Sequence, residues 1–205
     1  MSALLERGGQ MPEDTEIKKG EKSRYRLARS MKECMKHASV ESITVKQITE
    51  NCGLTRQTFY RNFLDKYDLI NWYFDKLLMK SFEHMGQGKT IYDALVKKFT
   101  YIKEEQNFFA AAFRYDSQNS LREHDFELIL GFYEKLLREK TGKEPEERVH
   151  YLLEMYCRSS IYMTVQWVLG EIKCNPEGLA HILVEGMPGK LADIFTEYEM
   201  LEEKL

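Results

Sequence analysis

The stretch 55–61 (TRQTFYR) concentrates side chains that can hydrogen-bond to nucleotides. An arginine guanidinium pairs with the edge of guanine, a glutamine amide pairs with adenine, and a threonine methyl contacts thymine. Arg56, Gln57 and Thr58 supply these three groups at consecutive positions. Residues of these types on the outer side of one short helix predict that the helix reads bases in the major groove of DNA.

The residues just before this stretch predict a first short helix and a tight turn. Thr44 and Gln47 have the spacing of a capping box, in which each side chain accepts a hydrogen bond from the other residue's backbone N–H. Gly53 supplies the positive φ that ends a helix at low cost. The apolar face of this helix is formed by Val45, Ile48 and Cys52.

A second helix is expected to begin at Thr55, whose hydroxyl can accept a hydrogen bond from a first-turn amide. Phe59 and Phe63 form its apolar side, and the polar residues, including Tyr60 and Arg61, face outward. Two short helices joined by a glycine turn predict a helix-turn-helix motif over 44–66. The second helix would be the recognition helix.

The charge of the chain is divided along its length. Residues 18–66 carry 12 Lys and Arg against 5 Asp and Glu, a net charge of +7. Residues 67–205 carry 17 against 24, a net charge of −7. A basic segment beside an acidic one indicates that only the first has a polyanion as its partner.

A further helix is predicted over about 22–38. Its apolar stripe is formed by Leu27, Met31, Cys34, Met35 and Ala38. Tyr25 lies near its start among Arg24, Arg26 and Arg29. Cations at a helix N-terminus attract phosphate, so we expect these residues to contact the DNA backbone. The alternative is a solvated basic face without a ligand.

Beyond residue 66 the apolar residues recur at helical spacing and no segment alternates as a strand does. Asp65 is expected to cap a helix over roughly 66–82 that is apolar on almost every side. Such a helix is predicted to lie between two bodies of the protein and to connect them.

Five later helices are expected, with starts signalled by local residues. Ser120 and Glu123 have capping-box spacing, and Asn175 before Pro176 is a second start signal. Pro188 with Gly189 must kink or split the last helix. The expected ranges are about 91–105, 107–115, 120–140, 146–171 and 176 onward.

These signals predict an all-α fold of about nine helices. Residues 1–20 have no periodicity and are expected to be a disordered tail. Residues 21–66 would form a three-helix DNA-binding domain, and residues 67–205 a larger helical domain.

Catalytic and metal-binding chemistry is not indicated. The four cysteines are scattered without a CxxC pair, and the five histidines are isolated. We therefore expect no catalytic residue, no metal and no cofactor. His124 and Asp125 are expected on the exposed side of their helix. The chain has no apolar run long enough to span a bilayer and no secretory signal at its start, so a cytoplasmic protein is predicted.

Residues from about 23 to 74 resemble the DNA-binding region of the tetracycline-repressor (TetR) family of bacterial transcription regulators. The residues that carry the resemblance are Thr44, Ile48-Thr49, Gly53-Leu54, Phe59-Tyr60-Arg61-Asn62-Phe63, and Lys66 with Leu69. The sequence TRQTFY and the pair Phe108-Phe109 resemble those of the branch that includes activators of dihydroxyacetone kinase genes. Gln57 departs from the pattern, because many members have a small residue there.

The resemblance implies roles for individual residues in binding a double-stranded operator. Base contacts would come from Thr55, Arg56, Gln57 and Thr58. Phosphate contacts would come from Thr44, Tyr60 and Lys66, and from Arg61 unless Arg61 is simply solvated. Phosphate contacts position a protein on DNA, and base contacts specify the sequence.

A dimer is expected because one recognition helix reads too few base pairs, so that two copies must read a palindrome. The resemblance implies that the homodimer forms through the eighth and ninth helices, about 146–171 and 176 onward, as a four-helix bundle. The alternative is that the helix over 146–171 is only the core of its own domain.

The resemblance also implies an effector that binds in 67–205 and changes DNA affinity. Candidate pocket residues are Phe82, Phe99, Phe113, Phe126, Tyr133 and Tyr156. Aromatic residues at helical spacing are also typical of an ordinary core. The effector is predicted to be a small molecule or, alternatively, a partner protein that docks on the helical domain.

Overall fold

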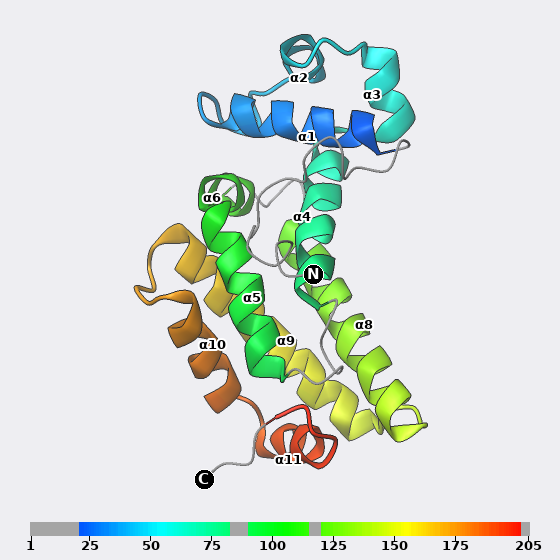
Figure 1. Ribbon diagram of the computed structural model, residues 1–205, viewed down its shortest axis with the longest axis vertical. Coiled ribbons are helices and arrows are strands. Elements are labelled where there is room, and N and C mark those ends of the chain that lie inside the picture. The colour runs from blue at the N-terminus through cyan, green and yellow to red at the C-terminus, as the bar shows by residue number, and fades with distance from the viewer. Residues whose placement is uncertain (1–20, 83–89, 115–119, 202–205) are drawn as a thin grey trace, which may run out of the picture.

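A computed structural model describes residues 21–82, 90–114 and 120–201 of the chain. Within these ranges every regular element is an α-helix, ten in all, so the predicted all-α class is confirmed. The predicted tail lies outside the described residues. Figure 1 shows the first helices of the chain forming a module that α4 (Lys66–Phe82) joins to a larger helical body.

The module contains α1 (Lys22–Met35), α2 (Val45–Asn51) and α3 (Arg56–Asn62). The predicted caps are confirmed. Thr44 and Gln47 form the capping box of α2, and Thr55 Oγ1 accepts a hydrogen bond from Thr58 N at the start of α3. The first helix ends three residues earlier than expected, at Met35, in a turn through Lys36.

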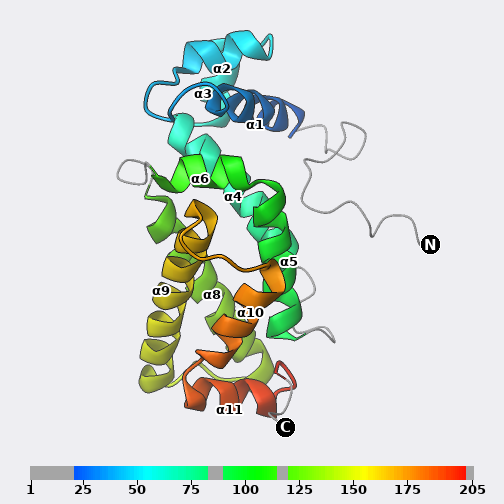
Figure 2. The ribbon, with the colours of Figure 1, turned by 90° about the vertical axis from the view of Figure 1, so that its left-hand side faces the viewer.

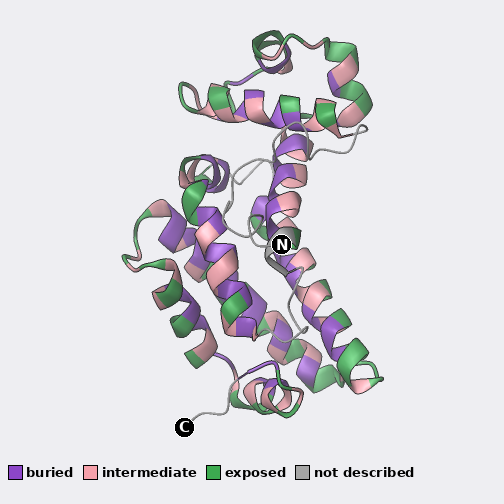
Figure 3. Ribbon diagram, viewed as in Figure 1, coloured by how far each residue is buried: buried purple, intermediate pink, exposed green. Residues whose placement is uncertain are grey.

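Helix α4 (Lys66–Phe82) begins where predicted, with Asp65 Oδ1 accepting hydrogen bonds from the amides of Tyr67 and Asp68. Most of its described side chains are buried or half-buried (Figure 3). It packs against α1 on one side and against α5 on the other. The helix is therefore the shared element of the module and the body, as its apolar character predicted.

The body contains seven helices. They are α5 (Ile91–Glu104), α6 (Gln106–Arg114), α8 (Leu121–Thr141), α9 (Glu147–Leu169), α10 (Pro176–Glu185) and α11 (Gly189–Glu197), together with the lower part of α4. Helix α5 packs along α10, and α8 pairs with α9 (Figure 2). The segment after α11 packs against the start of α5, because Ile91 N donates to Met200 O at 2.8 Å and Met200 is fully buried.

Two predictions about α8 are wrong. Ser120 makes no side-chain cap and has φ 48°, and Glu123 instead forms an ion pair with Arg158 of α9 at 2.6 Å. Asp125 is not on the surface but fully buried, with one carboxylate oxygen 3.7 Å from Lys98 Nζ. In both cases a partner distant in sequence determined where the side chain points.

The last third of the chain follows its local signals. Asn175 Oδ1 caps α10 through Gly178 N, with Pro176 in the first turn. Pro188 and Gly189 separate α10 from α11, as predicted from the inability of proline to continue a helix. This break accounts for a count of ten helices in the described residues instead of about nine.

Candidate nucleic-acid interface

The outer side of α3 carries four exposed polar side chains. Arg56, Gln57 and Arg61 are exposed, and so is Tyr60, with 60% of its surface accessible. Within the described residues, neither Arg56 nor Arg61 forms a hydrogen bond or an ion pair. Phe59, on the opposite side of the helix, is completely buried. Helix α3 is therefore amphipathic, and its outer side presents two guanidiniums without a partner among the described residues, an amide and a phenol.

The two threonines of this stretch are partly used within the protein. Thr55 Oγ1 accepts a hydrogen bond from Thr58 N at 3.1 Å and lies 3.0 Å from Thr58 Oγ1. Thr55 is exposed and Thr58 is half-buried. Their hydroxyls fix the start of α3, which leaves chiefly their methyl groups for contact with a ligand.

The turn between the two helices depends on Gly53, which has φ 64°. This left-handed conformation strains any residue with a side chain. Leu54 N then donates to Thr49 O at 2.9 Å and completes the turn. The conformation of one glycine therefore sets the angle at which α3 leaves α2.

Two arginines of α1 hold the carboxyl ends of these helices. Arg26 donates to Cys52 O at 2.6 Å, at the end of α2. Arg24 donates to Asn62 O at 3.2 Å, at the end of α3. Terminal carbonyls of a helix have no intrahelical partner and carry partial negative charge, so a guanidinium there is favourable. Two of the three arginines expected to touch DNA at the start of α1 thus bind helix ends within the protein.

A buried polar contact adds to this attachment. Ser30 Oγ donates to Ile48 O at 2.6 Å, and Asn51 Nδ2 donates to Ser30 Oγ at 3.0 Å. Ser30 is among the few buried polar residues of the described chain. These bonds fix α2 on α1 and leave the outer side of α3 unobstructed.

The predicted phosphate contacts are placed unequally. Thr44 is exposed, although its hydroxyl serves the cap of α2. Lys66 Nζ donates to Glu41 O and Ile43 O at 2.7 and 2.8 Å, and burial lowers its pKa. Its ammonium thus ties the loop before α2 to the start of α4.

Tyr25 differs from the other candidates, because its ring is buried. Only 8% of the residue is exposed, and the ring packs edge-on against Trp72 with centroids 5.0 Å apart. Burial, and secondarily the charge of Glu21, raises the pKa of its phenol. This placement makes Tyr25 part of the contact between α1 and α4, so its ring does not belong to the proposed DNA surface.

The aromatic residues predicted to line an effector pocket are mostly packed against one another. The ring of Phe99 lies 5.7 Å from that of Trp167, and Phe113 is stacked with Phe109. Tyr133 and Tyr156 are in edge contact, and burial raises the pKa of both phenols far above the ordinary value. The side chain of Phe82 lies outside the described residues.

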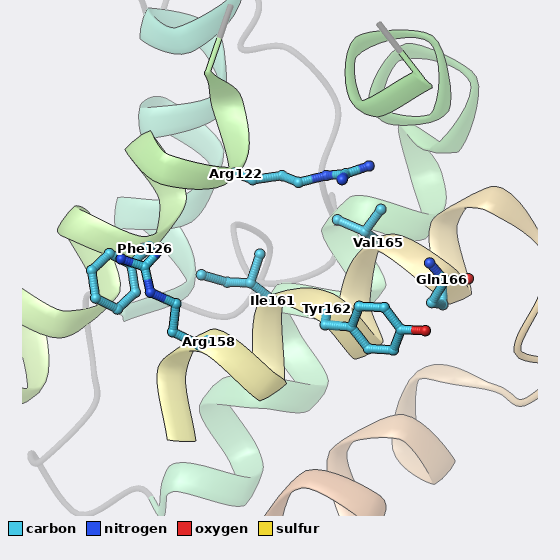
Figure 4. A pocket seen from close by; sticks show the side chains of 7 residues that line it. All are labelled: Arg122, Phe126, Arg158, Ile161, Tyr162, Val165 and Gln166. Carbon is cyan, nitrogen blue, oxygen red and sulfur yellow. The ribbon is translucent and has the colours of Figure 1, made fainter. Parts of the chain in front are cut away.

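Phe126 is the one predicted pocket residue beside a described cavity. The cavity has a volume of about 200 Å³ between α8 and α9. Figure 4 shows the guanidinium of Arg158 lying against the ring of Phe126, at 3.5 Å from its centroid. Arg158 is also held by Glu123, so its charge is already compensated.

The two largest of the described cavities lie elsewhere and contain none of the predicted pocket residues. One, of about 640 Å³, lies between the end of α1 and the α5–α6 corner, and Lys32 and Glu105 form an ion pair across it. The other, of about 810 Å³, is a groove among α5, α10 and α11. The carboxylates along this groove belong to Asp93, Asp193 and Glu197.

Several contributors to this site have no local signature in the sequence. The attachments by Arg24 and Arg26 join residues 38 and 26 positions apart. Leu64 is 85% exposed between α3 and α4, although from sequence a leucine at this position would be expected in the core.

Among the described residues, no group of three or more His, Cys, Asp or Glu side chains is placed to bind a metal ion. No described helix is long and apolar enough to cross a bilayer.

Comparison with known proteins gives one family match and several structural likenesses. Residues 89–189 match the family model TetR_C_8, described as a transcriptional regulator C-terminal region. No curated protein matches the chain. The dihydroxyacetone kinase operon activator DhaS has a similar structure, with a TM-score of 0.58, 17% identity, and coverage of 88% of this chain and 98% of that one. A tetR-family transcriptional regulator from Streptomyces coelicolor has a TM-score of 0.52 and 14% identity, covering 88% and 92%.

Proposed function

This chain belongs to the TetR family of transcriptional regulators, and from that premise we propose that it binds a palindromic DNA operator as a dimer. The match over 89–189 lies outside the stretch that suggested the family from sequence, so the two lines of argument use different residues. The family is one of regulators and not of enzymes.

The surface of α3 is the observation that carries this proposal. Arg56 and Arg61 are exposed and unpaired within the described residues, while α1 holds the helix from behind through Arg24. In this proposal Arg56 and Gln57 contact base edges, the methyl groups of Thr55 and Thr58 contact thymine, and Tyr60, Arg61 and Thr44 contact phosphates.

Binding to duplexes of defined sequence tests the proposal. Wild-type protein is used to select duplexes from a random pool, and its affinity for the selected site is then measured at several salt concentrations. We expect a palindromic site and a steep decrease of affinity with salt, because each neutralised phosphate releases counterions. A pool that yields no preferred sequence, or affinity independent of salt, would contradict DNA recognition.

Exposed apolar side chains on α9 and α10 support dimerisation in this proposal. Tyr151, Met155 and Tyr162 lie along α9 with 57%, 57% and 62% of their surfaces accessible, and Ile182 of α10 is 41% accessible. Contiguous apolar residues on the surface of a single chain are typical of an interface. We expect Tyr162→Glu to shift the protein from dimer to monomer in analytical ultracentrifugation. The exposed Tyr60→Glu, on α3, is the matched control and should leave the mass unchanged.

The proposed effector acts through the body, since α4 is shared by the body and the module. The second candidate is a partner protein, and the acidic groove among α5, α10 and α11 favours it because this groove opens at the surface. A protein that co-purifies in a fixed ratio with the wild-type chain, and is lost from Asp193→Lys, would support the partner. A small molecule that changes operator affinity of the isolated chain would support the first candidate.

A further inference from the structure

The guanidinium of Arg24 lies where three elements of the protein meet. It comes from the first turn of α1, donates to the last carbonyl of α3, and lies against rings from the end of α3 and from α4. Its central carbon is 5.4 Å from the ring centroid of Phe63 and 5.7 Å from that of Trp72. The two rings contact each other, with centroids 5.6 Å apart.

The rings around Arg24 continue into both neighbouring elements. Phe63 contacts Phe59, the completely buried residue of α3, at 5.8 Å. On the other side, Lys76 Nζ lies 5.6 Å from the Trp72 ring and pairs with Glu21 at 2.6 Å. A row of contacts thus runs from inside the recognition helix to α4 and back to the start of α1.

An arginine in this setting is suited to hold a helix end. Its planar guanidinium stacks on aromatic faces while its N–H groups donate in the same plane, which an ammonium cannot reproduce. The acceptor, Asn62 O, lies at the negative end of α3, where a carbonyl has no partner within the helix. A guanidinium engaged in this way has fewer donors left for a phosphate.

We propose that Arg24 is a positioning residue, which fixes the recognition helix α3 relative to α4 and does not bind DNA itself. This inference rests on the proposed function and goes beyond it. Three arginines of the module thus have two different roles in this proposal. Arg56 and Arg61 meet the DNA, and Arg24 determines the angle at which they meet it.

The salt dependence of binding separates a positioning role from a phosphate contact. Arg24→Lys and Arg24→Gln are compared with Arg61→Gln on the duplex selected by the wild-type protein and on an unrelated duplex. We expect both Arg24 variants to bind the selected duplex about tenfold more weakly, with the wild-type salt slope and little loss on unrelated DNA. Arg61→Gln should make the slope shallower by about 0.9 and weaken both duplexes alike.

The opposite pattern would overturn the proposal. A phosphate contact at Arg24 predicts a shallower slope for Arg24→Gln, equal losses on both duplexes, and recovery by Arg24→Lys because lysine keeps the charge. Thermal unfolding of each variant checks that it remains folded at the temperature of the binding assay.

Hydrogen exchange without DNA provides a test that does not depend on the proposed function. Phe63 N donates to Phe59 O at 2.9 Å in the last turn of α3. We expect Arg24→Lys to accelerate amide exchange over 61–63 while exchange in α2 stays as in the wild type. Unchanged exchange over 61–63 would contradict the proposal that Arg24 fixes the end of α3. A wild-type protein that selects no duplex, with faster exchange in the variant, would instead contradict only the proposed function.

Emission from Trp72 gives a second measurement on the free protein. The chain has two tryptophans, so the Trp167→Phe variant leaves Trp72 as the single reporter. Because the guanidinium lies against this ring, Arg24→Gln in that background should shift or intensify the emission. Arg61→Gln should leave it unchanged. An emission spectrum insensitive to Arg24→Gln would contradict the stacked arrangement.

Discussion

The module at one end of the molecule and the body at the other use charged side chains differently. In the module, Arg56 and Arg61 are exposed on α3 and have no partner within the described residues. In the body, Lys98 and Asp125 are 2% and 0% exposed, and the Lys98 ammonium lies 3.7 Å from a carboxylate oxygen of Asp125. The first arrangement leaves charge available to a ligand, and the second removes it from water at considerable cost.

This difference predicts which property a substitution changes in each region. Under the proposed function, removing an exposed guanidinium of α3 should change DNA binding and leave the fold intact, because no described residue is paired with it. Removing one member of a buried pair leaves the other uncompensated in a medium of low dielectric constant. Substitutions in the module should therefore affect DNA affinity, and substitutions in the buried pair should affect stability.

The largest effect is expected for Asp125→Ala. The substitution leaves the Lys98 ammonium buried without a counter-ion, and we expect a loss of about 3–5 kcal/mol in the free energy of unfolding. Urea denaturation followed by circular dichroism measures this loss. Burial raises the pKa of the Asp125 carboxyl and Lys98 opposes that effect, so the pair is the natural target.

Two controls sharpen this first prediction. Lys98→Met combined with Asp125→Leu removes both charges and should restore stability to near the wild-type value. Glu139→Ala breaks the exposed pair between Lys135 and Glu139, 3.8 Å apart, and should change stability by less than about 0.5 kcal/mol. Equal losses from Asp125→Ala and Glu139→Ala would show that burial of the pair is irrelevant.

The next largest effect is expected for Arg56→Ala, which should change DNA affinity and leave the free energy of unfolding unchanged. Arg56→Ala should reduce affinity for the selected operator by about 1–3 kcal/mol and relax the preference at the base pair it reads. Competition binding with single-base-pair variants of the operator measures the change. If every variant loses affinity equally, Arg56 contacts phosphate and not a base.

Matched capping boxes give a direct comparison of the two regions. Thr44 with Gln47 begins α2 in the module, and Thr90 with Asp93 begins α5 in the body. Thr44→Ala and Thr90→Ala should each reduce the free energy of unfolding by about 1 kcal/mol. Only Thr44→Ala should also weaken operator binding, as measured by fluorescence anisotropy. Similar effects of both variants on binding would remove the phosphate role proposed for Thr44.

The smallest effect concerns the contact between α8 and α4. His124 Nε2 lies 2.6 Å from Asp75 Oδ1, and this hydrogen bond raises the pKa of the imidazole above its ordinary value of 6.5, against the opposing effect of burial. A raised pKa stabilises the folded state fully below about pH 6.5, and the contribution is lost as pH rises through the raised value. Both groups are about one-third exposed, which reduces the effect.

We therefore expect the stability of the wild type relative to His124→Gln to decline by a few tenths to about 1 kcal/mol between pH 6 and pH 8. Urea denaturation at several pH values measures this difference. A difference that is constant over this range would contradict a charged contact between α8 and α4.

The fold was largely predictable because its helix boundaries are encoded locally. Thr44, Thr55, Asp65 and Asn175 all cap the helices that they were expected to cap. Such a signal involves residues two or three positions apart, so it is complete in a short stretch of sequence. The predicted helix-turn-helix and its outward-facing residues follow from the same local rules.

The remaining features depend on partners that a short stretch does not contain. Glu123 has the spacing to cap α8 but pairs with Arg158, 35 residues later. Asp125 would be exposed on an isolated helix, yet Lys98 of α5 accompanies it into the core. Tyr25 follows the same rule, because Trp72 covers its ring. For the candidate site, sequence therefore indicated which side chains face outward and missed which basic residues are already engaged.

The hydrogen bond between Ile91 and Met200 has a consequence for the order in which the protein is made. Residues 22–63 can pack on one another and on α4 soon after they leave the ribosome, since their partners are near in sequence. The start of α5 meets its partner only after Met200 has been synthesised, more than a hundred residues later. During synthesis, the module that carries α3 thus precedes by more than a hundred residues the residue that completes the body.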